Sequence, residues 1–373
     1  MTTLRVIVDD IVAPAHPGVS SYAEELTRAL IIEAPAGCDV AGIVSASPAT
    51  DYQTLELLLP GLAGLQKSSL ARRELRTVWQ HGLGGQTRAG LIHSPSLLAP
   101  LRRHDRLNSE EQTVVTVHDT IAWTSPDSLS SAEVRWRKAM VKRAHRYADA
   151  VVVPTHAVAD QLDEIHRFGE RIRVIGKAVS SKLILPVDPP ARAERLKLPD
   201  HYVLAMGARA GHKGLRSLLV AMARPELAHV PLLVTGDVDM NTLATEAGLD
   251  LSRVRTLGRL EPADLAVAFD RATVFAFPSL AEGFGLPVLE AFRFGTPVVH
   301  SDDPAVLEVS AGAGMAVERG EAAEYPGRLA EAIASVLSDR DLAEGLRVQG
   351  LDRERLFNWQ DSAEKIWQLH ADL

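Results

Sequence analysis

Cysteine is nearly missing from this sequence. Cys38 is the only one among 373 residues, so no disulfide can form within the chain and no cysteine-based metal site is available. No uncharged apolar run approaches the ~18 residues of a membrane-spanning helix. The opening residues MTTLRVIVDD lack the basic segment and the longer apolar core of a secretory signal. We therefore expect a cytoplasmic protein in a reducing environment, either dissolved or peripheral on the inner face of a membrane.

Net positive charge is also lacking. Asp and Glu number 48 against 40 Lys and Arg, which gives a formal net charge of −8 at pH 7. General nucleic-acid binders are usually basic enough to displace counterions from phosphate, so we expect no nucleic-acid partner. The Gly-x4-Gly-Lys-Ser/Thr phosphate loop, the Gly-x-Ser-x-Gly nucleophile turn and the His-Glu-x-x-His zinc helix are missing as well. The function therefore has to be sought in other patterns.

Short apolar runs alternate with helix-like stretches in two blocks, separated by a proline-rich stretch at 177–199. This alternation predicts an α/β fold with two parallel sheets, each covered by helices on both faces. We expect two Rossmann-like domains, at 1–185 and 186–355, with ligand bound in a cleft at the carboxyl ends of the strands. The expected strands are Leu4–Val8, Val40–Val44, Thr113–Val117, Ala150–Val153, Tyr202–Met206, Pro231–Thr235, Arg253–Leu257, Thr273–Phe277 and Pro297–Val299.

The most informative motif is EGFGLPVLE, from Glu282 to Glu290, which follows the strand-like run Thr273–Pro278. A strand, a turn containing Gly283 and Gly285, and then a helix would present free backbone N–H groups to an anion such as phosphate. Glu282 would lie at that end of the helix and Glu290 between one and two turns further along. Such an arrangement suits a nucleotide sugar, which is a pyrophosphate between a ribose and a hydroxyl-rich sugar.

A second glycine turn, GARAGHKG at 207–214, follows the run Tyr202–Met206 and opens the next helix. It places Arg209 and Lys213 at the carboxyl end of a strand. Two cations there are able to neutralise a diphosphate and to stabilise the negative charge that grows on a leaving group.

The stretch PSLAEGFGLPVLEA, with its continuation FGTPVV, resembles the donor-site signature of the retaining family 4 glycosyltransferases. The resemblance implies a GT-B fold of two Rossmann-like domains, with the last helix, about 356–373, packed back on the first domain. The family pattern also has an Arg and a Lys at the spacing of Arg209 and Lys213. These two residues and the amides of Gly283, Phe284, Gly285 and Leu286 are then expected to hold the diphosphate, Glu282 the donor sugar and Glu290 the ribose.

Two further residues of the first domain match family positions. Gly18, in Pro17-Gly18-Val19, is expected near the donor phosphates and the acceptor, although many members carry two or more glycines there. His118 follows the run Thr113–Val117, and the resemblance implies that it lies close to the donor sugar and the reacting bond. A histidine that only caps the strand is the alternative. His93, which also ends a strand-like run, is not expected to touch substrate.

The residues and the resemblance together predict a retaining glycosyltransferase that moves a hexose from a nucleoside-diphosphate sugar to an acceptor hydroxyl. GDP-mannose is the first candidate donor and a UDP-sugar the second, with no separate cofactor. Asp237-Val238-Asp239 resembles the metal motif of the other large glycosyltransferase fold, but we interpret it as a helix N-cap and expect no metal. The alternatives are a catalytically silent nucleotide-sugar-binding subunit, and an epimerase or sugar phosphorylase of the same architecture.

The sequence says little about the acceptor, which we leave as a sugar, a glycan or a lipid-linked molecule, or about the oligomeric state. Residues 66–90 show no strand pattern and are expected to form a surface loop or, alternatively, an acceptor-side lid. Ser131–Tyr147 predicts a basic helix. We expect it to pack on the sheet with its basic face in water, with contact to anionic lipid as the alternative.

Overall fold

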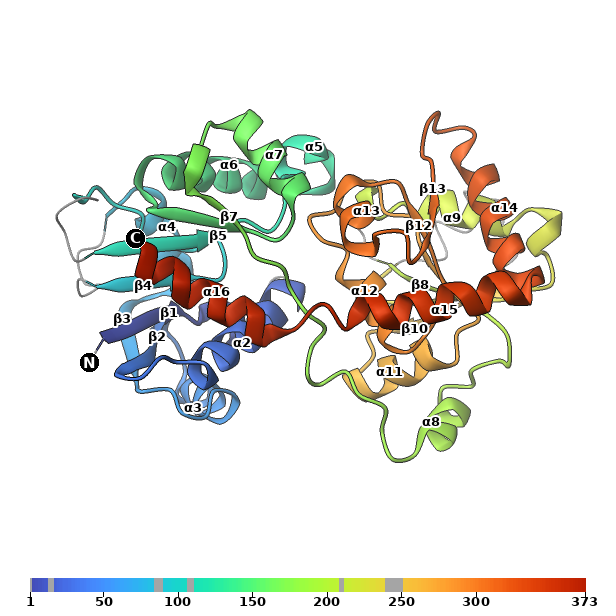
Figure 1. The fold of residues 1–373 in the computed structure, drawn as a ribbon, viewed down its shortest axis with the longest axis horizontal. Helices are drawn as coiled ribbons and strands as arrows, with labels where there is room; N and C mark the ends of the chain where they lie inside the picture. The colour runs from blue at the N-terminus through green and yellow to red at the C-terminus, as the bar shows by residue number, and fades with distance from the viewer. Residues whose placement is uncertain (1, 13–16, 84–89, 106–110, 208–210, 239–250) are drawn as a thin grey trace. The chain divides into compact units, whose positions relative to one another are not determined.

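The computed structural model describes residues 2–12, 17–83, 90–105, 111–207, 211–238 and 251–373 (Figure 1). The chain forms two compact units. The first comprises Met1–Trp123, Ser130–Ser180 and Asn358–Leu373, and the second comprises Thr124–Leu129 and Ser181–Phe357.

The first unit contains a seven-stranded parallel sheet with the order β3-β2-β1-β4-β5-β6-β7. Leu4 in the interior strand β1 pairs with Val40 on one side and Leu91 on the other. Apolar runs dominate its central strands because helices cover both faces. The strands are β1 (Thr2–Ile7), β2 (Cys38–Ala46), β3 (Leu65–Ala71), β4 (Leu91–Ser94), β5 (Gln112–Thr116), β6 (Ala150–Val153) and β7 (Ile172–Val174).

The helices of the N-terminal half divide between the two faces of this sheet. One face packs on α2, α3 and the C-terminal helix, and the other packs on α4, α6 and α7. The helices are α1 (Asp9–Val12), α2 (Pro17–Ile32), α3 (Ala49–Leu58), α4 (Arg72–Gln80), α5 (Ile121–Thr124), α6 (Ser131–Tyr147) and α7 (His156–Ile165).

The last helix, α16 (Trp359–Asp372), is part of the first unit although it ends the chain. It lies beside α2 (Figure 1). Its residues Ala363, Ile366 and Trp367 are buried against the sheet, and the Trp367 indole N–H donates to the Leu30 carbonyl at 3.1 Å. Burial of this apolar face holds α16 on the unit that the start of the chain builds.

The expectation of an irregular segment at 66–90 is wrong for its described residues. β3 is an edge strand and α4 follows it at once. The strand was missed because LQKSSLA is polar, and an edge strand with a half-exposed face needs no apolar run. Arg72, Arg73 and Arg76 lie on an amphipathic helix, in which Leu75 and Trp79, four residues apart, are buried.

The second unit contains a six-stranded parallel sheet with the order β10-β9-β8-β11-β12-β13. All five strands expected here are present, and only the three-residue β13 has no counterpart among them. Two parallel α/β sheets confirm the predicted fold class. The strands are β8 (Val203–Met206), β9 (Leu232–Thr235), β10 (Val254–Gly258), β11 (Val274–Phe277), β12 (Val298–Ser301) and β13 (Met315–Val317).

The helices of the second unit cover both faces of its sheet. α9 and α14 pack on one apolar face, while α12 packs beside β11 and β12. The proline-rich stretch at 177–199 is not simply a linker, because it contains α8, whose Arg192 and Arg195 bind Asp264 at 2.8 and 2.6 Å. The helices are α8 (Pro189–Arg195), α9 (Leu215–Met222), α11 (Pro262–Asp270), α12 (Leu286–Arg293), α13 (Pro304–Ser310), α14 (Tyr325–Ser338) and α15 (Arg340–Glu354).

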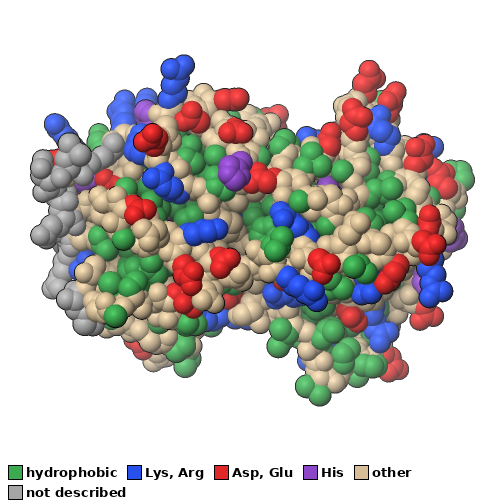
Figure 2. Space-filling view, in the orientation of Figure 1, with side chains coloured by type: hydrophobic (Ala, Val, Ile, Leu, Met, Phe, Trp, Pro, Cys, Tyr) green, Lys and Arg blue, Asp and Glu red, His purple; other side chains and the backbone are tan. Residues whose placement is uncertain are grey.

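Charge on the visible surface is mixed. On the face shown in Figure 2, acidic and basic side chains are interspersed. The predicted basic helix is α6, and two of its cations make internal contacts: Arg137 pairs with Glu133, and Arg143 donates to the Leu101 carbonyl. These contacts favour a helix packed on its sheet. In the part of the chain that the structure covers, no helix has both the length and the apolar composition to span a bilayer.

Candidate active site

Three neighbouring strands of the second unit end in the loops that carry the donor motif. β11 lies between β8 and β12, and all three are parallel. The loops that follow them therefore meet at one edge of the sheet, the edge where open α/β sheets bind ligands. These loops lead to the 3₁₀ turn Gly211–Lys213 after β8, to α12 after β11 and to α13 after β12.

Lys213 and Glu282 form an ion pair at this edge. Lys213 Nζ lies 2.5 Å from Glu282 Oε1, and Ser279 Oγ donates to the same oxygen at 2.7 Å. The Glu282 side chain is 10% exposed and that of Lys213 27%, so both are shielded yet reachable from solvent. The structure thus brings together two residues that the sequence placed in separate motifs.

Gly214 explains how these loops come so close. It has φ +65°, and a Cβ added to it would lie 1.9 Å from the carbonyl oxygen of Pro278. Only glycine tolerates both the left-handed backbone and this approach. The beginning of α9, and with it Lys213, is thereby held against the end of β11.

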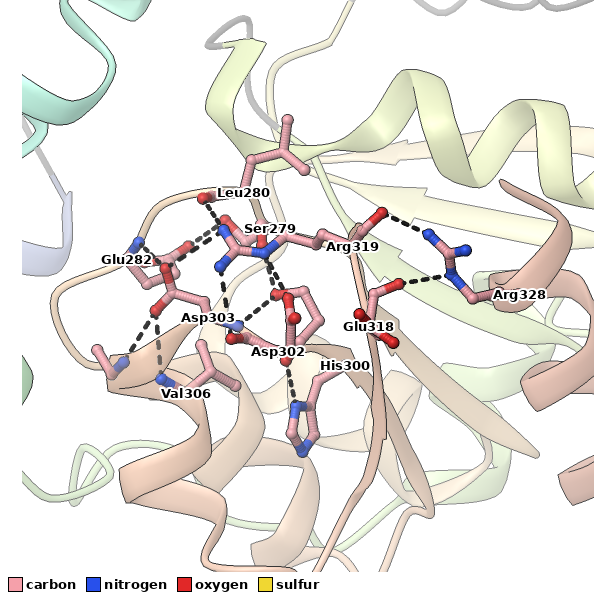
Figure 3. Close-up of polar contacts among 12 residues, drawn as sticks. Ser279, Leu280, Glu282, His300, Asp302, Asp303, Val306, Glu318, Arg319 and Arg328 are labelled. Carbon is pink, nitrogen blue, oxygen red and sulfur yellow. Dashed lines mark hydrogen bonds and ion pairs between the residues drawn. The ribbon is translucent and has the colours of Figure 1, made fainter. Parts of the chain in front are cut away.

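Asp303 supports the Glu282 loop from the neighbouring strand. Asp303 Oδ2 accepts the backbone N–H of Glu282 at 3.2 Å, while Oδ1 accepts those of Ala305 and Val306 at 3.0 and 3.3 Å (Figure 3). Burial raises the pKa of Asp303, the N–H of Val306 opposes this effect, and the charge of Glu282 raises it further. One carboxylate therefore caps α13 and fixes the Glu282 backbone.

Arg319, two residues after β13, also stabilises the loop that carries Glu282. Its Nε lies 2.5 Å from Asp302 Oδ1, and its Nη1 donates to the carbonyl of Leu280 (Figure 3). Arg328 in turn donates to the Arg319 carbonyl at 2.6 Å. Sequence reasoning missed this support. The signal available was the pair Asp302 and Asp303, three and four residues after the strand-like run at 297–299 and so at the same carboxyl edge.

The turn before α12 has the geometry that the motif predicts. Gly285 has φ +81° and precedes the first residue of the helix, Leu286. Phe284 is buried and meets Phe357 edge-on, with ring centroids 5.8 Å apart, and Gly283 is also buried. The aromatic anchor fixes the turn, so the first N–H groups of α12 have a defined direction.

Glu290 lies further along α12 and is half-buried. Burial raises its pKa to about 7, and the positive charge of Arg293 only partly opposes that effect. Burying a carboxylate with little compensation costs stability. Carboxylates with a strongly shifted pKa are common in ligand-binding and catalytic sites.

His118 follows β5 in the first unit. Its Nε2 lies 2.8 Å from the carbonyl oxygen of Pro95, so the proton is assigned to Nε2, and Nδ1 is then the acceptor nitrogen of the neutral ring. The ring packs edge-on against Tyr22 with centroids 4.8 Å apart. These contacts fix the orientation of the imidazole.

A pocket of about 120 Å³ adjoins His118 within the first unit. Its charged lining residues come from the segments that follow β1, β3 and β5 and from α4 and α6. Sequence reasoning did not bring these residues together in one site, although Arg72 and Arg76 belong to the segment 66–90 for which an acceptor-side lid was the alternative, and Arg72 directly follows β3. The charged lining residues are Asp10, Arg72, Arg76, Asp119, Glu133 and Arg137.

The remaining predicted residues are less informative. Gly18 is the second residue of α2, is exposed, and has no atom within 4 Å of an added Cβ. His93 is fully buried in β4. Arg209 and Asp239 lie outside the described residues, as does the helix that was expected to follow Asp239.

Comparison with known proteins agrees with this geometry. Residues 17–182 match the family described as Glycosyltransferase Family 4, and residues 200–339 match the one described as Glycosyl transferases group 1. O-antigen chain mannosyltransferase B of Escherichia coli is 28% identical over 289 residues, 73% of this chain and 71% of the relative. D-inositol 3-phosphate glycosyltransferase 1 of Catenulispora acidiphila is 31% identical over 241 residues, and this chain spans only 56% of it.

A solved structure shows the same fold. HepE from Anabaena, crystallised with UDP and glucose, aligns over 100% of both chains with a TM-score of 0.72 at 18% identity. Two parallel α/β sheets, strand–turn–helix motifs at their carboxyl edges and a family match in each half of the chain lead to one assignment. The chain belongs to the family 4 glycosyltransferases, and its fold is GT-B.

Proposed function

We propose that this protein is a retaining hexosyltransferase that moves a sugar, with mannose as the first candidate, from a nucleoside-diphosphate sugar to an acceptor hydroxyl. The observation that carries the proposal is the Lys213–Glu282 pair beside the start of α12. It combines a cation and a helix N-terminus, which suit a diphosphate, with a carboxylate, which suits sugar hydroxyls. The name of the E. coli relative, a mannosyltransferase, supports mannose.

The proposed donor contacts follow the order of groups in a nucleotide sugar. Lys213 and Arg209, with the backbone amides of residues 283–286, bind the two phosphates. Glu282 accepts hydrogen bonds from the hydroxyls of the sugar, and Glu290 accepts them from the ribose. His118 is assigned, on the family resemblance, to hydrogen bonding with a sugar hydroxyl near the reacting bond.

In the proposed reaction, the bond between the anomeric carbon and the phosphate oxygen breaks first. The cations and amides stabilise the negative charge that grows on the diphosphate. The acceptor hydroxyl then attacks the oxocarbenium-like carbon from the face that the diphosphate leaves, and the departing phosphate oxygen takes the acceptor's proton. The configuration at the anomeric carbon is retained. Lys213 and Arg209 supply the positive charge, so the reaction requires no metal ion and no separate cofactor.

Thermal-shift titration with GDP-, UDP- and ADP-sugars tests the donor. A ligand at 100 times its Kd stabilises a folded protein by ~2.7 kcal/mol, so the true donor should stand out. We expect GDP-mannose to give the largest shift. An NMR assignment of the product's anomeric configuration tests retention.

Slow hydrolysis of the donor without acceptor tests catalysis itself. We expect Arg209→Ala to lower this turnover by ~10²–10³, because a single oxyanion contact is worth that much. Tight donor binding with no turnover for any acceptor would instead indicate a silent nucleotide-sugar-binding subunit. An unchanged rate in Arg209→Ala would remove Arg209 from the site.

A further inference from the structure

The pocket beside His118 has a lining whose charges cancel. Arg72 Nη2 lies 2.6 Å from Asp10 Oδ1, and Arg76 Nη2 lies 2.5 Å from Glu133 Oε2. Arg137 binds Glu133 and Asp119, each at 2.9 Å. Among the lining residues that the structure describes, three guanidinium groups therefore face three carboxylates.

In the centre of this network, the pKa shifts of Glu133 and Arg137 favour their charged forms. Burial alone would raise the pKa of Glu133, but hydrogen bonds and charges from Arg76 and Arg137 outweigh it and lower that pKa. Burial also acts to lower the pKa of Arg137, yet Asp119 and Glu133 raise it overall. Each described guanidinium group of the lining is thus paired with a carboxylate, and an anion entering the pocket would find no uncompensated cation.

The same lining has hydrogen-bonding capacity that the protein leaves unused. Within the described part of the chain, the buried donor Trp136 Nε1 has no hydrogen-bond acceptor, and Arg72 Nη1 has none either, its ion-pair partner Asp9 Oδ1 lying 3.8 Å away. The carboxylates, each with several lone pairs, accept from only a few donors; Asp10 Oδ2, for example, accepts from Ser96 Oγ at 2.7 Å. Hydroxyl groups, which both donate and accept, satisfy such a mixed set.

Aromatic surface completes the pocket. Trp123 and Trp136 both line it, and Arg76 lies over the Trp136 ring at 3.8 Å from the ring centroid, which fixes that indole. A pyranose is a matching partner, because it has an apolar face of C–H groups and a rim of hydroxyls. Packing that face on indole surface adds dispersion and hydrophobic contributions to the polar contacts.

We propose that this pocket binds an uncharged pyranose as the acceptor sugar and disfavours acceptor rings that carry a phosphate. The proposal rests on the function proposed above and specifies its acceptor. His118, which the proposed function assigns to the reacting bond, lines the same pocket. The charge balance of Arg72, Arg76 and Arg137 with their carboxylates is the determinant of this selectivity.

An acceptor panel tests the selectivity directly. Transfer from the donor is measured with methyl α-mannopyranoside, with a neutral mannose disaccharide and with inositol 1-phosphate at equal concentrations. We expect the neutral sugars to be glycosylated and inositol 1-phosphate to react at least ten times more slowly. Equal or faster reaction of inositol 1-phosphate would overturn the inference. If no nucleotide sugar is bound or hydrolysed at all, the proposed function fails first, and the two failures are therefore distinguishable.

Two variants connect the selectivity to the pocket. Trp136→Phe removes one buried N–H donor, so the KM for the neutral acceptor should rise about 3- to 10-fold while the affinity for the donor stays the same. Glu133→Gln removes one negative charge and should raise the relative rate with inositol 1-phosphate. Glu164→Gln is the matched control, because Glu164 is an exposed residue of α7 and its replacement removes the same charge. It should leave the rate with inositol 1-phosphate, relative to that with the neutral sugar, unchanged. An unchanged acceptor KM in Trp136→Phe, or an unchanged ratio in Glu133→Gln, would contradict the proposal.

Discussion

Lys213 Nζ lies 2.5 Å from Glu282 Oε1, although the two residues belong to loops that follow different strands. The proposed phosphate-binding cation and the proposed sugar-binding carboxylate are thus direct neighbours. Each fixes the position of the other, and Ser279 holds the shared oxygen from a third direction. A donor that binds here has its diphosphate and its sugar located by one connected set of side chains.

Lys213→Met and Glu282→Gln should each reduce the rate of donor turnover. Loss of the cation removes stabilisation of the leaving diphosphate, so we expect a fall of ~10²–10³ in kcat/KM for Lys213→Met. The double variant should lose less than the sum of the two single losses in free energy, because paired residues act together. Initial rates of donor hydrolysis give these values. Lys365→Met, an exposed change on α16, is the control, and a fully active Lys213→Met would refute the assignment.

Gly214→Ala should destabilise the protein. The added Cβ would lie 1.9 Å from the Pro278 carbonyl oxygen, on a backbone with φ +65°. The left-handed conformation alone costs ~1 kcal/mol for a residue with a side chain, and the collision adds to it. Urea unfolding measures the loss. Gly211→Ala lies three residues earlier with no atom within 4 Å of its added Cβ, so it should unfold like the parent protein.

Glu290 should make nucleotide binding depend on pH near neutrality. Burial raises its pKa to about 7, and only the ionised carboxylate accepts two ribose hydroxyl groups well. Affinity for the free nucleoside diphosphate should therefore weaken as the pH falls from 8 to 6. Isothermal titration calorimetry at several pH values checks this, and Glu290→Gln should show a flatter dependence. Identical pH profiles for the two proteins would exclude the role.

The same pKa shift affects folding in a predictable direction. The folded protein keeps the proton on Glu290 at pH values where the unfolded chain has released it, so stability falls as the pH rises from about 4.5 to about 7. Glu290→Gln should remove this loss and gain stability at pH 8.

Two buried histidines should make the folded protein less stable at low pH, which is opposite to the effect of Glu290. His93 and His370 lie with ring centroids 5.7 Å apart, between β4 and α16, and burial lowers both pKa values, that of His370 to about 4. The unfolded chain takes up these protons near pH 6.5, so stability should be lost as the pH falls from 6.5 towards 4. Melting temperatures across this range test the prediction. His370→Gln should give a shallower decline than the parent, whereas the exposed His201→Gln should not.

Local sequence patterns were sufficient for much of the fold. Runs such as Ala150–Val153 and Val298–Ser301 become strands because apolar, β-branched residues are needed wherever a parallel strand is covered on both faces. The edge strands β3, β7 and β13 were missed, since partial exposure removes that pattern.

The sequence by itself determined the two α/β blocks and the glycine turn before α12. Buried strands require runs of apolar residues, and a left-handed backbone favours glycine, so both features can be read from neighbouring residues. Only the tertiary structure decided which distant residues meet. Trp367 and Leu30 are 337 residues apart, Lys213 and Glu282 are 69 apart, and Arg72 and Asp10 are 62 apart. No local pattern encodes such pairs. They form because parallel strands bring their carboxyl ends to one edge of a sheet, and because the apolar face of an amphipathic helix packs on a sheet that distant residues build.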